Sequence, residues 1–345
     1  MMNRRRVFLL AVPGALAGCM KGQTRRLNVM NWGDYIGSTT IRDFEREFQV
    51  KVRYGTYENN EELFGKVMGG NSGWDVVFPT QNRVAPMRQL GLLAPLEHRR
   101  LPGLANLFAR FQKPLWDPSL EWCVPYMWTT SGIAYNSRLY HAGAPESWKD
   151  LWDERARGKL TMLDDVDDVF GAALAKLGYA YNSANPEHLR RAQQEIITQK
   201  RLVRAYISTE ARDQMVAGDV LVAQTFATTA QLAIDGNADV VYRHPKDAFA
   251  VYCDCGVILR ESKRTELAHE FLNYTLRPDV SAKIAQTIRT ATPNEKAFAS
   301  LAASEQANAT LYPASEVLDR AEWPLPLPPE IVRLRDRLWT EVKAG

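Results

Sequence analysis

Hydrophobic and polar positions follow two different spacings along this chain, and each spacing predicts one kind of secondary structure. Short apolar or alternating runs predict strands at residues 27–30, 48–53, 75–78, 125–136, 160–163, 219–225, 240–242 and 247–259. Apolar residues three and four apart predict helices at residues 41–48, 59–68, 83–90, 148–157, 169–177, 186–199, 266–276 and 278–288. Strands that alternate with helices in this order are typical of an α/β protein with largely parallel sheets.

The segment Asn31-Trp32-Gly33-Asp34-Tyr35 follows the first predicted strand and precedes a helix for which Ser38 is the predicted N-cap. In open α/β sheets, ligands bind outside the carboxyl ends of the strands. Indole and phenol faces attract cations, and a nearby carboxylate pairs with an ammonium group. Trp32, Asp34 and Tyr35 therefore suit a ligand that carries amines on an aliphatic backbone. The alternative is that the aromatic residues belong to the core and that Asp34 is a solvated loop residue.

Four of the five residues from 164 to 168 are aspartates, and they lie between a predicted strand and a predicted helix. With Asp165 as N-cap, Asp168 falls at the third helical position, so both carboxylates lie at the positive end of the helix dipole. That arrangement explains one aspartate but not four. Crowded carboxylates repel one another unless a cation, such as a diamine or a metal, joins them. The segment lacks the glycine of a calcium-binding loop.

Tyr252 and Asp254 are two residues apart in a predicted strand, so their side chains point to the same face. An aromatic residue beside a carboxylate repeats the chemistry of Trp32 and Asp34. The alternative is a half-exposed strand whose polar and apolar positions alternate by chance.

The N-terminus predicts export. Three arginines precede an apolar run, and Leu16-Ala17-Gly18-Cys19 resembles the cleavage box of bacterial lipoproteins, in which the cysteine is lipidated. We therefore expect a signal peptide at residues 1–18, a lipid anchor on Cys19 and a tether at residues 19–26; the alternative is an ordinary cleaved signal. Removing three arginines leaves 40 basic residues against 40 acidic residues, so the charge of the exported chain does not indicate nucleic-acid binding.

No residue pattern favours catalysis, a cofactor or a metal. The five histidines are scattered, and nucleophile, phosphate-loop and zinc-ligand motifs are missing from the sequence. We therefore predict that the chain is not an enzyme. Cys123, Cys253 and Cys255 are expected either as three buried thiols or as a disulfide between Cys123 and one of the other two.

Seven segments together resemble the spermidine/putrescine-binding proteins of bacterial ABC importers, over residues 27–344. They are residues 31–36, 56–61, 75–80, 124–128, 163–170, 271–280 and 291–294. The resemblance implies an α/β fold of the two-lobed periplasmic-binding-protein type (type II), with an interlobe cleft and chain crossovers. It implies a first lobe of residues 27–129 and 253–297 and a second lobe of residues 130–252 and 298–345. Ligand would close the lobes by a hinge motion.

The resemblance also implies a set of ligand-binding residues, namely Trp32, Asp34, Tyr35, Thr80, Asn82, Asp165, Asp168, Phe226, Tyr252, Asp254 and Thr290. This chain departs from the family pattern in several of these and neighbouring positions. Gly33 replaces a serine or threonine, Phe226 replaces a tryptophan and Thr290 replaces an aromatic residue. Pro324 stands where a polar contact can occur. Arg289 is unexpected, because a cation facing the cleft would oppose a polyamine.

The N-terminal segment predicts an exported, membrane-anchored lipoprotein of the periplasm or cell surface, and the resemblance implies its task. The chain would capture a polyamine and deliver it to the permease subunits of an ABC importer, as a monomer that touches the membrane only through its lipid. Two alternatives stay open. The cleft could bind another organic cation or an amino-carboxylate ligand, which the direction of Arg289 would help to distinguish. The protein could also be a sensor lipoprotein that transports nothing.

Overall fold

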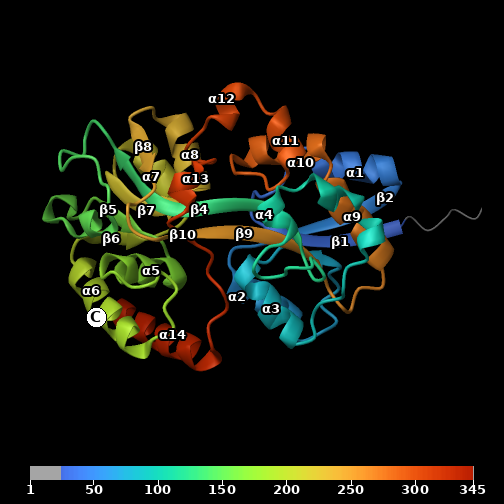
Figure 1. Ribbon diagram of the computed structural model, residues 1–345, viewed down its shortest axis with the longest axis horizontal. Helices are drawn as coiled ribbons and strands as arrows, with labels where there is room; N and C mark the ends of the chain where they lie inside the picture. Colours follow the sequence, from blue (N-terminus) through green and yellow to red (C-terminus); the bar gives the residue numbers. More distant parts are fainter. Residues whose placement is uncertain (1–24, 345) are drawn as a thin grey trace, which may run out of the picture.

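Two long strands run through both lobes of the protein in the computed structural model, which describes residues 25–344 (Figure 1). The strands are β4 (Val124–Asn136) and β9 (Phe249–Ile258), which pair antiparallel along β4 residues 124–130. From Ser131 onward, β4 instead pairs with β7 (Val222–Phe226) and β8 (Val240–Arg243). The chain therefore passes from lobe to lobe along β4 and β9. The exact lobe boundaries at residues 129, 252 and 297 stay predictions.

The first lobe is built on strands whose order is β2-β1-β3-β9. Its other strands are β1 (Arg25–Trp32), β2 (Val50–Tyr57) and β3 (Val76–Val77). Its helices are α1 (Thr40–Phe48), α2 (Asn60–Val67), α3 (Gln81–Gln89), α4 (Ala109–Gln112), α9 (Thr265–Thr275), α10 (Pro278–Ile288) and α11 (Glu295–Ser300), with short 3₁₀ turns at His98–Arg100 and Pro102–Asn106.

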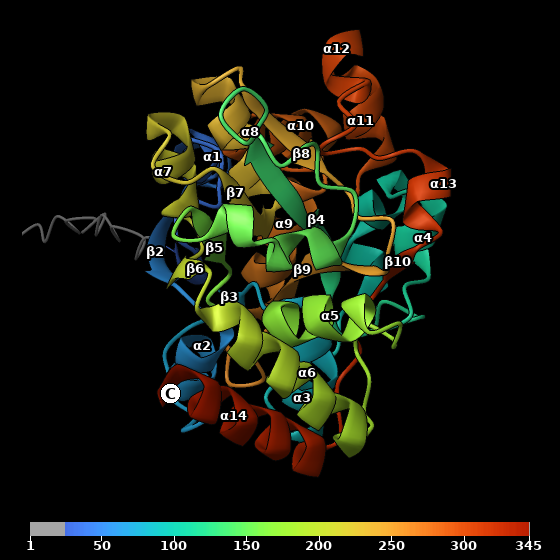
Figure 2. The ribbon, with the colours of Figure 1, turned by 90° about the vertical axis from the view of Figure 1, so that its left-hand side faces the viewer.

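The second lobe continues the same sheet in the order β4-β7-β5-β6. Its remaining strands are β5 (Leu160–Met162), β6 (Val203–Tyr206) and β10 (Ala321–Glu322), of which β10 pairs with β9. Its helices are α5 (Val166–Lys176), α6 (Pro186–Lys200), α7 (Ala211–Ala217), α8 (Ala227–Gly236), α12 (Ala303–Gln306), α13 (Ser315–Leu318) and α14 (Pro329–Ala344), with 3₁₀ turns at Trp148–Trp152 and Glu154–Ala156. Figure 2 shows α14 lying alongside α6.

The prediction of largely parallel sheets is correct for the outer strands and for the short pairing of β10 with β9, but not for the pairing of β4 with β9. β1 pairs parallel with β2 and β3, and β5 pairs parallel with β6 and β7. β4 and β9 are antiparallel to each other, because the chain leaves the first lobe along β4 and returns along β9. β4 is also antiparallel to β7 and β8.

Several local predictions can be compared directly with the structure. Ser38 is not the N-cap of α1, because the helix begins one residue later, after Thr39, where Gly37 O accepts a hydrogen bond from Thr40 N. Asp165 is the N-cap of α5, as predicted. The three cysteines at 123, 253 and 255 are buried free thiols.

The predicted signal peptide at residues 1–18, the lipidation site Cys19 and residues 19–24 of the tether lie outside the described residues. The last two tether residues are a correction, because Arg25 and Arg26 belong to β1, where they pair with Val50 and Lys51 of β2. Among residues 25–344, no helix combines the length and apolar character needed to span a membrane.

Candidate ligand-binding cleft

A cleft of about 780 Å³ lies between the two lobes and receives side chains from both. The first lobe contributes residues that follow β1, β2 and β3, because the carboxyl ends of these parallel strands meet at one edge of the sheet. The second lobe contributes the loop after β5, the end of β7 and one face of α14. Of the predicted site, the lining includes Trp32, Asp34, Tyr35, Thr80, Asn82, Asp165, Phe226, Tyr252 and Asp254.

Asp254 presents a half-buried carboxylate to the cleft from β9. Its Oδ1 accepts a hydrogen bond of 3.1 Å from Thr80 Oγ1, which in turn accepts one of 3.2 Å from Asn60 Nδ2. Burial raises the pKa of Asp254 to about 7, although hydrogen bonding from Tyr35, Thr80 and Trp32 opposes this shift. Within residues 25–344, Asp254 forms no ion pair, so its charge is available to a cationic ligand.

Aromatic rings line the cleft on both sides of Asp254. The Trp32 ring is held by a hydrogen bond of 2.8 Å from Nε1 to Phe78 O, and it packs 4.8 Å from the ring centroid of Tyr57. Tyr252 meets Phe226 edge to face, with centroids 5.9 Å apart and ring planes at 87°. These fixed rings offer apolar faces to methylene groups and π-faces to cations.

Asp165 brings a second carboxylate to the cleft from the N-terminus of α5. Its Oδ1 accepts hydrogen bonds from the backbone N–H groups of Asp167 at 2.8 Å and of Asp168 at 3.2 Å. Burial and the neighbouring charge of Asp167 raise the pKa of Asp165 to about 6. Asp165 therefore combines the capping role with a position in the lining of the cleft.

Asp168 does not line the cleft, although it was predicted as the partner of Asp165. It is fully buried beneath the surface, where its Oδ1 accepts a hydrogen bond of 2.8 Å from the Tyr181 hydroxyl. Among residues 25–344, its Oδ2 has no hydrogen-bond partner. Burial, followed by the charge of Asp165, raises the pKa of Asp168 well above its usual range. The third residue of α5 points into the lobe, which explains the difference.

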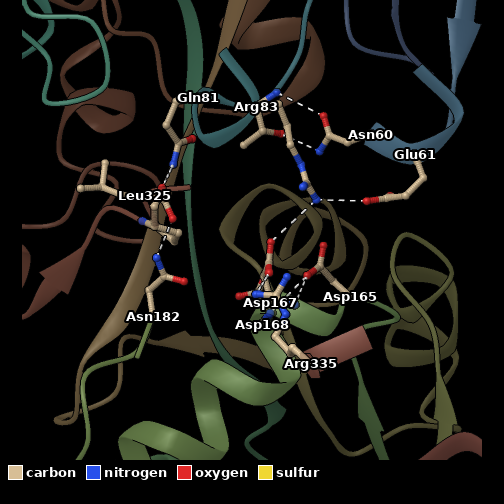
Figure 3. A network of polar contacts seen from close by, with 12 residues as sticks. Asn60, Glu61, Gln81, Arg83, Asp165, Asp167, Asp168, Asn182, Leu325 and Arg335 are labelled. Atoms are coloured by element: carbon tan, nitrogen blue, oxygen red, sulfur yellow. Dashed lines mark hydrogen bonds and ion pairs between the residues drawn. The ribbon is translucent and has the colours of Figure 1, made fainter. Parts of the chain in front are cut away.

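Two arginines neutralise part of the acidic cluster, and sequence reasoning missed both. Arg335 of α14 is buried and forms an ion pair with Asp167. Arg83 of α3 lies 3.0 Å from Glu61 and 4.0 Å from Asp167, measured from its Nη2 (Figure 3). No local sequence pattern predicts these ion pairs, because each joins residues that are far apart in the sequence.

Arg289 does not line the cleft, so the expected repulsion of a polyamine does not arise there. It ends α10 at a φ of 54°, and its guanidinium pairs with Asp235 at 2.6 and 3.0 Å. Thr290 is also buried away from the cleft. Its hydroxyl shares a hydrogen bond of 2.7 Å with Thr228 and donates one of 3.2 Å to Trp128 O. Thr228 lines the cleft instead.

The other predicted positions take different places. Asn82 is buried at the cleft wall, and its Oδ1 has no hydrogen-bond partner within the described chain. Gly33 is exposed at the cleft, where a serine or threonine hydroxyl is missing. Pro324 joins the lobes through its carbonyl, which accepts a hydrogen bond of 3.2 Å from Gln81 Nε2.

The cleft carries a large excess of negative charge. Among residues 25–344, the cationic side chains that line it are Arg83 and Arg212, and Arg212 pairs with its neighbour Asp213 at 2.8 Å. The lining carboxylates are Asp34, Glu58, Glu61, Asp164, Asp165, Asp167, Glu210, Asp213, Asp254 and Asp336. Such a cleft concentrates cations. Residues 25–344 contain no group of three or more His, Cys, Asp or Glu side chains placed to hold a metal ion.

One face of α14 completes the lining with Asp336, Trp339 and Thr340, which sequence reasoning did not single out. Their spacing of three and four residues places them together on a helix, and this is the signal that could have found them. The Trp339 ring packs edge-on against Tyr206, with centroids 5.0 Å apart and planes at 89°.

Comparison with known proteins gives a consistent set of matches. The family model described as bacterial extracellular solute-binding protein matches residues 39–311. The spermidine/putrescine-binding periplasmic protein of Escherichia coli is 30% identical, covering 91% of this chain and 92% of that one. The putrescine/cadaverine-binding protein of Pseudomonas aeruginosa is 30% identical, covering 97% and 98%. A solved structure from Listeria monocytogenes, described provisionally as a spermidine/putrescine ABC transporter, has a TM-score of 0.89 at 31% identity, covering 93% and 99%.

Proposed function

Because this chain belongs to the family of bacterial extracellular solute-binding proteins, we propose that it captures a polyamine in its interlobe cleft and delivers it to the permease subunits of an ABC importer. Relatives that cover nearly the whole chain carry the names of spermidine, putrescine and cadaverine binders. In this proposal the cleft captures and releases a solute, and it does so without a cofactor and without catalysis.

The observation that carries this proposal is the environment of the Asp254 carboxylate. Its carboxylate is half-buried, lacks a cationic partner within the described chain and lies beside aromatic rings. A charge-assisted hydrogen bond from an ammonium group would satisfy it, and the rings would cover the methylene groups of the ligand. A buried ion pair of this kind offsets the cost of removing water from the amine only when both partners are well placed.

We assign separate roles to the residues of the two lobes. Asp254 and Asp165 would each pair with one ammonium group, so that a bound diamine bridges β9 and α5. Trp32, Tyr35, Phe226 and Tyr252 would line the aliphatic chain. Thr80 would hold Asp254 in place through its hydrogen bond of 3.1 Å. Asn82 would use its free Oδ1 to accept an N–H group of the ligand.

Further residues of the predicted site would act less directly. Asp34 is exposed at the mouth of the cleft and would attract the amine before it binds. Asp168 would act from beneath, by its charge on Asp165. Thr290 would hold the hydroxyl of Thr228, which does line the cleft.

We further propose that the protein is exported and anchored through Cys19, and that it works as a monomer. Support for the anchor comes from Leu16-Ala17-Gly18-Cys19 alone. A ligand with a carboxylate is less well supported than a polyamine, because Asp235 already pairs with Arg289. Mass spectrometry of the protein isolated from membranes tests the anchor, since a diacylglyceryl group on Cys19 would appear as a fixed mass increase.

The direct test is calorimetric titration of the non-lipidated protein, unfolded and refolded to remove bound ligand. Putrescine, cadaverine, spermidine and spermine are titrated into wild type, into Asp254→Asn and into the control Asp319→Asn, whose carboxylate lies outside the cleft. Saturable binding that Asp254→Asn weakens by about 2–5 kcal/mol, with Asp319→Asn unchanged, supports the proposal. Absence of binding with all four amines, or unaltered binding by Asp254→Asn, contradicts it.

A further inference from the structure

An ammonium group of the protein itself, on Lys343, lies beside the α14 end of the cleft without being part of its lining. The Nζ of Lys343 lies 5.0 Å from the ring centroid of Trp339, and it forms an ion pair with Asp164. Trp339 and Asp164 both line the cleft, from α14 and from the loop between β5 and α5. An aromatic face and a carboxylate around one ammonium group are the contacts by which proteins recognise amines.

The position of the Trp339 ring is fixed independently of Lys343. Its edge-on packing against Tyr206 of β6 sets the plane of the indole. Asp336, one turn earlier on the same face of α14, also lines the cleft and forms no ion pair within residues 25–344. Burial raises the pKa of Asp336, and the charges of Asp167 and Glu61 act in the same direction, whereas the charges of Arg335 and Arg83 oppose the shift. This end of the cleft therefore retains acceptors for positive charge beyond the one that Lys343 uses.

Lys343 is held only loosely, so another amine could replace it. The side chains of Lys343 and Asp164 are 43% and 48% exposed. Ion pairs this exposed contribute only about 0–1 kcal/mol, and ordering the long lysine side chain costs rotamer entropy. A ligand ammonium whose position is already set by the inner part of the cleft would avoid most of that entropy cost.

We infer that Asp164 and Trp339 form an outer ammonium subsite, which Lys343 occupies in the ligand-free protein and which the additional amine of a triamine or tetraamine takes over. This inference rests on the proposed function. A diamine satisfied by Asp254 and Asp165 leaves the outer subsite to Lys343. The subsite therefore selects for the number of amines in the ligand, whereas Asp254 is needed by every polyamine.

The test compares putrescine with spermine by calorimetric titration of wild type and three variants. Asp164→Asn and Trp339→Leu keep side-chain size or apolar packing but remove the charge or the aromatic face. Each is expected to weaken spermine binding by about tenfold while putrescine changes by less than about twofold. Lys343→Met removes the competing ammonium, so spermine binding is expected to strengthen by about threefold with putrescine unchanged. Thermal unfolding verifies that each variant is folded.

Lys176 supplies a matched control away from the cleft. Its Nζ lies 5.0 Å from the Trp152 ring and 2.6 Å from Glu195, so it repeats the same contacts without lining the cleft. Lys176→Met is expected to leave both affinities unchanged. Two results would overturn the inference: cleft variants that affect putrescine and spermine equally, or cleft variants that affect neither amine. In both cases the proposed function still stands if polyamine binding depends on Asp254. Failure of wild type to bind either amine would overturn both.

Discussion

Arg83 and Asp167 form an ion pair across the cleft, with Nη2 of Arg83 on α3 lying 4.0 Å from Oδ2 of Asp167 on α5. The same guanidinium contacts Glu61 of α2 at 3.0 Å, and the buried Arg335 holds the other oxygen of Asp167 (Figure 3). The two lobes are therefore joined by charge as well as by the strands β4 and β9.

Replacing this link should open the ligand-free protein. In Arg83→Gln, the lobes lose one attractive contact, so we expect small-angle X-ray scattering to report a larger radius of gyration than for wild type. Saturating polyamine should restore the wild-type value, because ligand would bridge the lobes instead. Arg88→Gln is the control, since Arg88 lies on the same helix, is exposed and does not line the cleft. An unchanged radius in Arg83→Gln would show that this ion pair does not set the lobe position.

The raised pKa of Asp254 predicts how ligand affinity depends on pH. The carboxylate must be ionised to pair with an ammonium group, and its pKa is about 7. Affinity should therefore fall by about tenfold per pH unit below pH 7, until other carboxylates titrate. The phenols that face it, Tyr35, Tyr57 and Tyr126, have pKa values raised by burial and stay neutral throughout. Titrations from pH 8 to pH 6 check this, and Asp254→Asn should show a much flatter profile over that range, because Asp165 titrates only at about pH 6 and below.

The same shift predicts the opposite trend for the stability of the ligand-free protein. The unfolded pKa of an aspartate is about 3.9, so between about pH 4 and pH 7 the folded state binds more protons at Asp254 than the unfolded state does. The contribution of Asp254 to the free energy of unfolding is therefore present at low pH and is lost as the pH rises to about 7. Denaturant melts of wild type and Asp254→Asn across this range measure the difference, which should shrink when polyamine is present.

A larger aromatic ring at position 226 should strengthen cation binding. Phe226 lines the cleft edge-on to Tyr252, and an indole offers a stronger negative face than a phenyl ring. We expect Phe226→Trp to tighten polyamine binding by about 0.5–1 kcal/mol in calorimetric titration. Phe108→Trp, at a half-buried ring outside the cleft, controls for the added tryptophan. Weaker binding by Phe226→Trp would mean that the extra ring volume obstructs the ligand.

Arg289 offers a test in which affinity should not change. Because it pairs with Asp235 outside the cleft lining, Arg289→Asn should leave polyamine affinity within about twofold of wild type. Asparagine tolerates the left-handed conformation that this helix end requires. Loss of this partly exposed ion pair should lower the free energy of unfolding by about 1 kcal/mol or less. Tighter polyamine binding in this variant would mean that the guanidinium does oppose the ligand.

The sequence predicted those parts of the site that short-range spacing determines. Asp165 caps α5 because a strand ends and a helix begins there, and both events leave a local pattern. Trp32 and Asp34 reach the cleft for the same reason, since Trp32 is the last residue of β1 and Asp34 follows it in the next loop. The alternation that placed Tyr252 beside Asp254 on one face of β9 also holds, as both line the cleft.

Contacts between distant segments escaped prediction because nothing local encodes them. Asp167 is paired by Arg335, which reaches it only after α14 folds back onto α5 and α6. The buried position of Thr290 follows from the way α10 ends against β4 and α8, where its hydroxyl meets Thr228 and Trp128. Arg289 turns away from the cleft because Asp235 on α8 offers it a partner. Resemblance to a family predicts which positions of the chain lie near the site, but it does not predict the direction in which each side chain points.

A pivot built from paired strands constrains the kind of movement the lobes can make. β4 and β9 are hydrogen-bonded to each other along residues 124–130 of β4, which resists sliding but allows the ribbon to twist and bend. Groups carried on the pivot move least when the lobes rotate, and Tyr252 and Asp254 are such groups. A ligand that docks first on β9 would thus meet a stationary anchor. The acidic residues of α5 and α14 would then move toward an amine that Asp254 already holds in place.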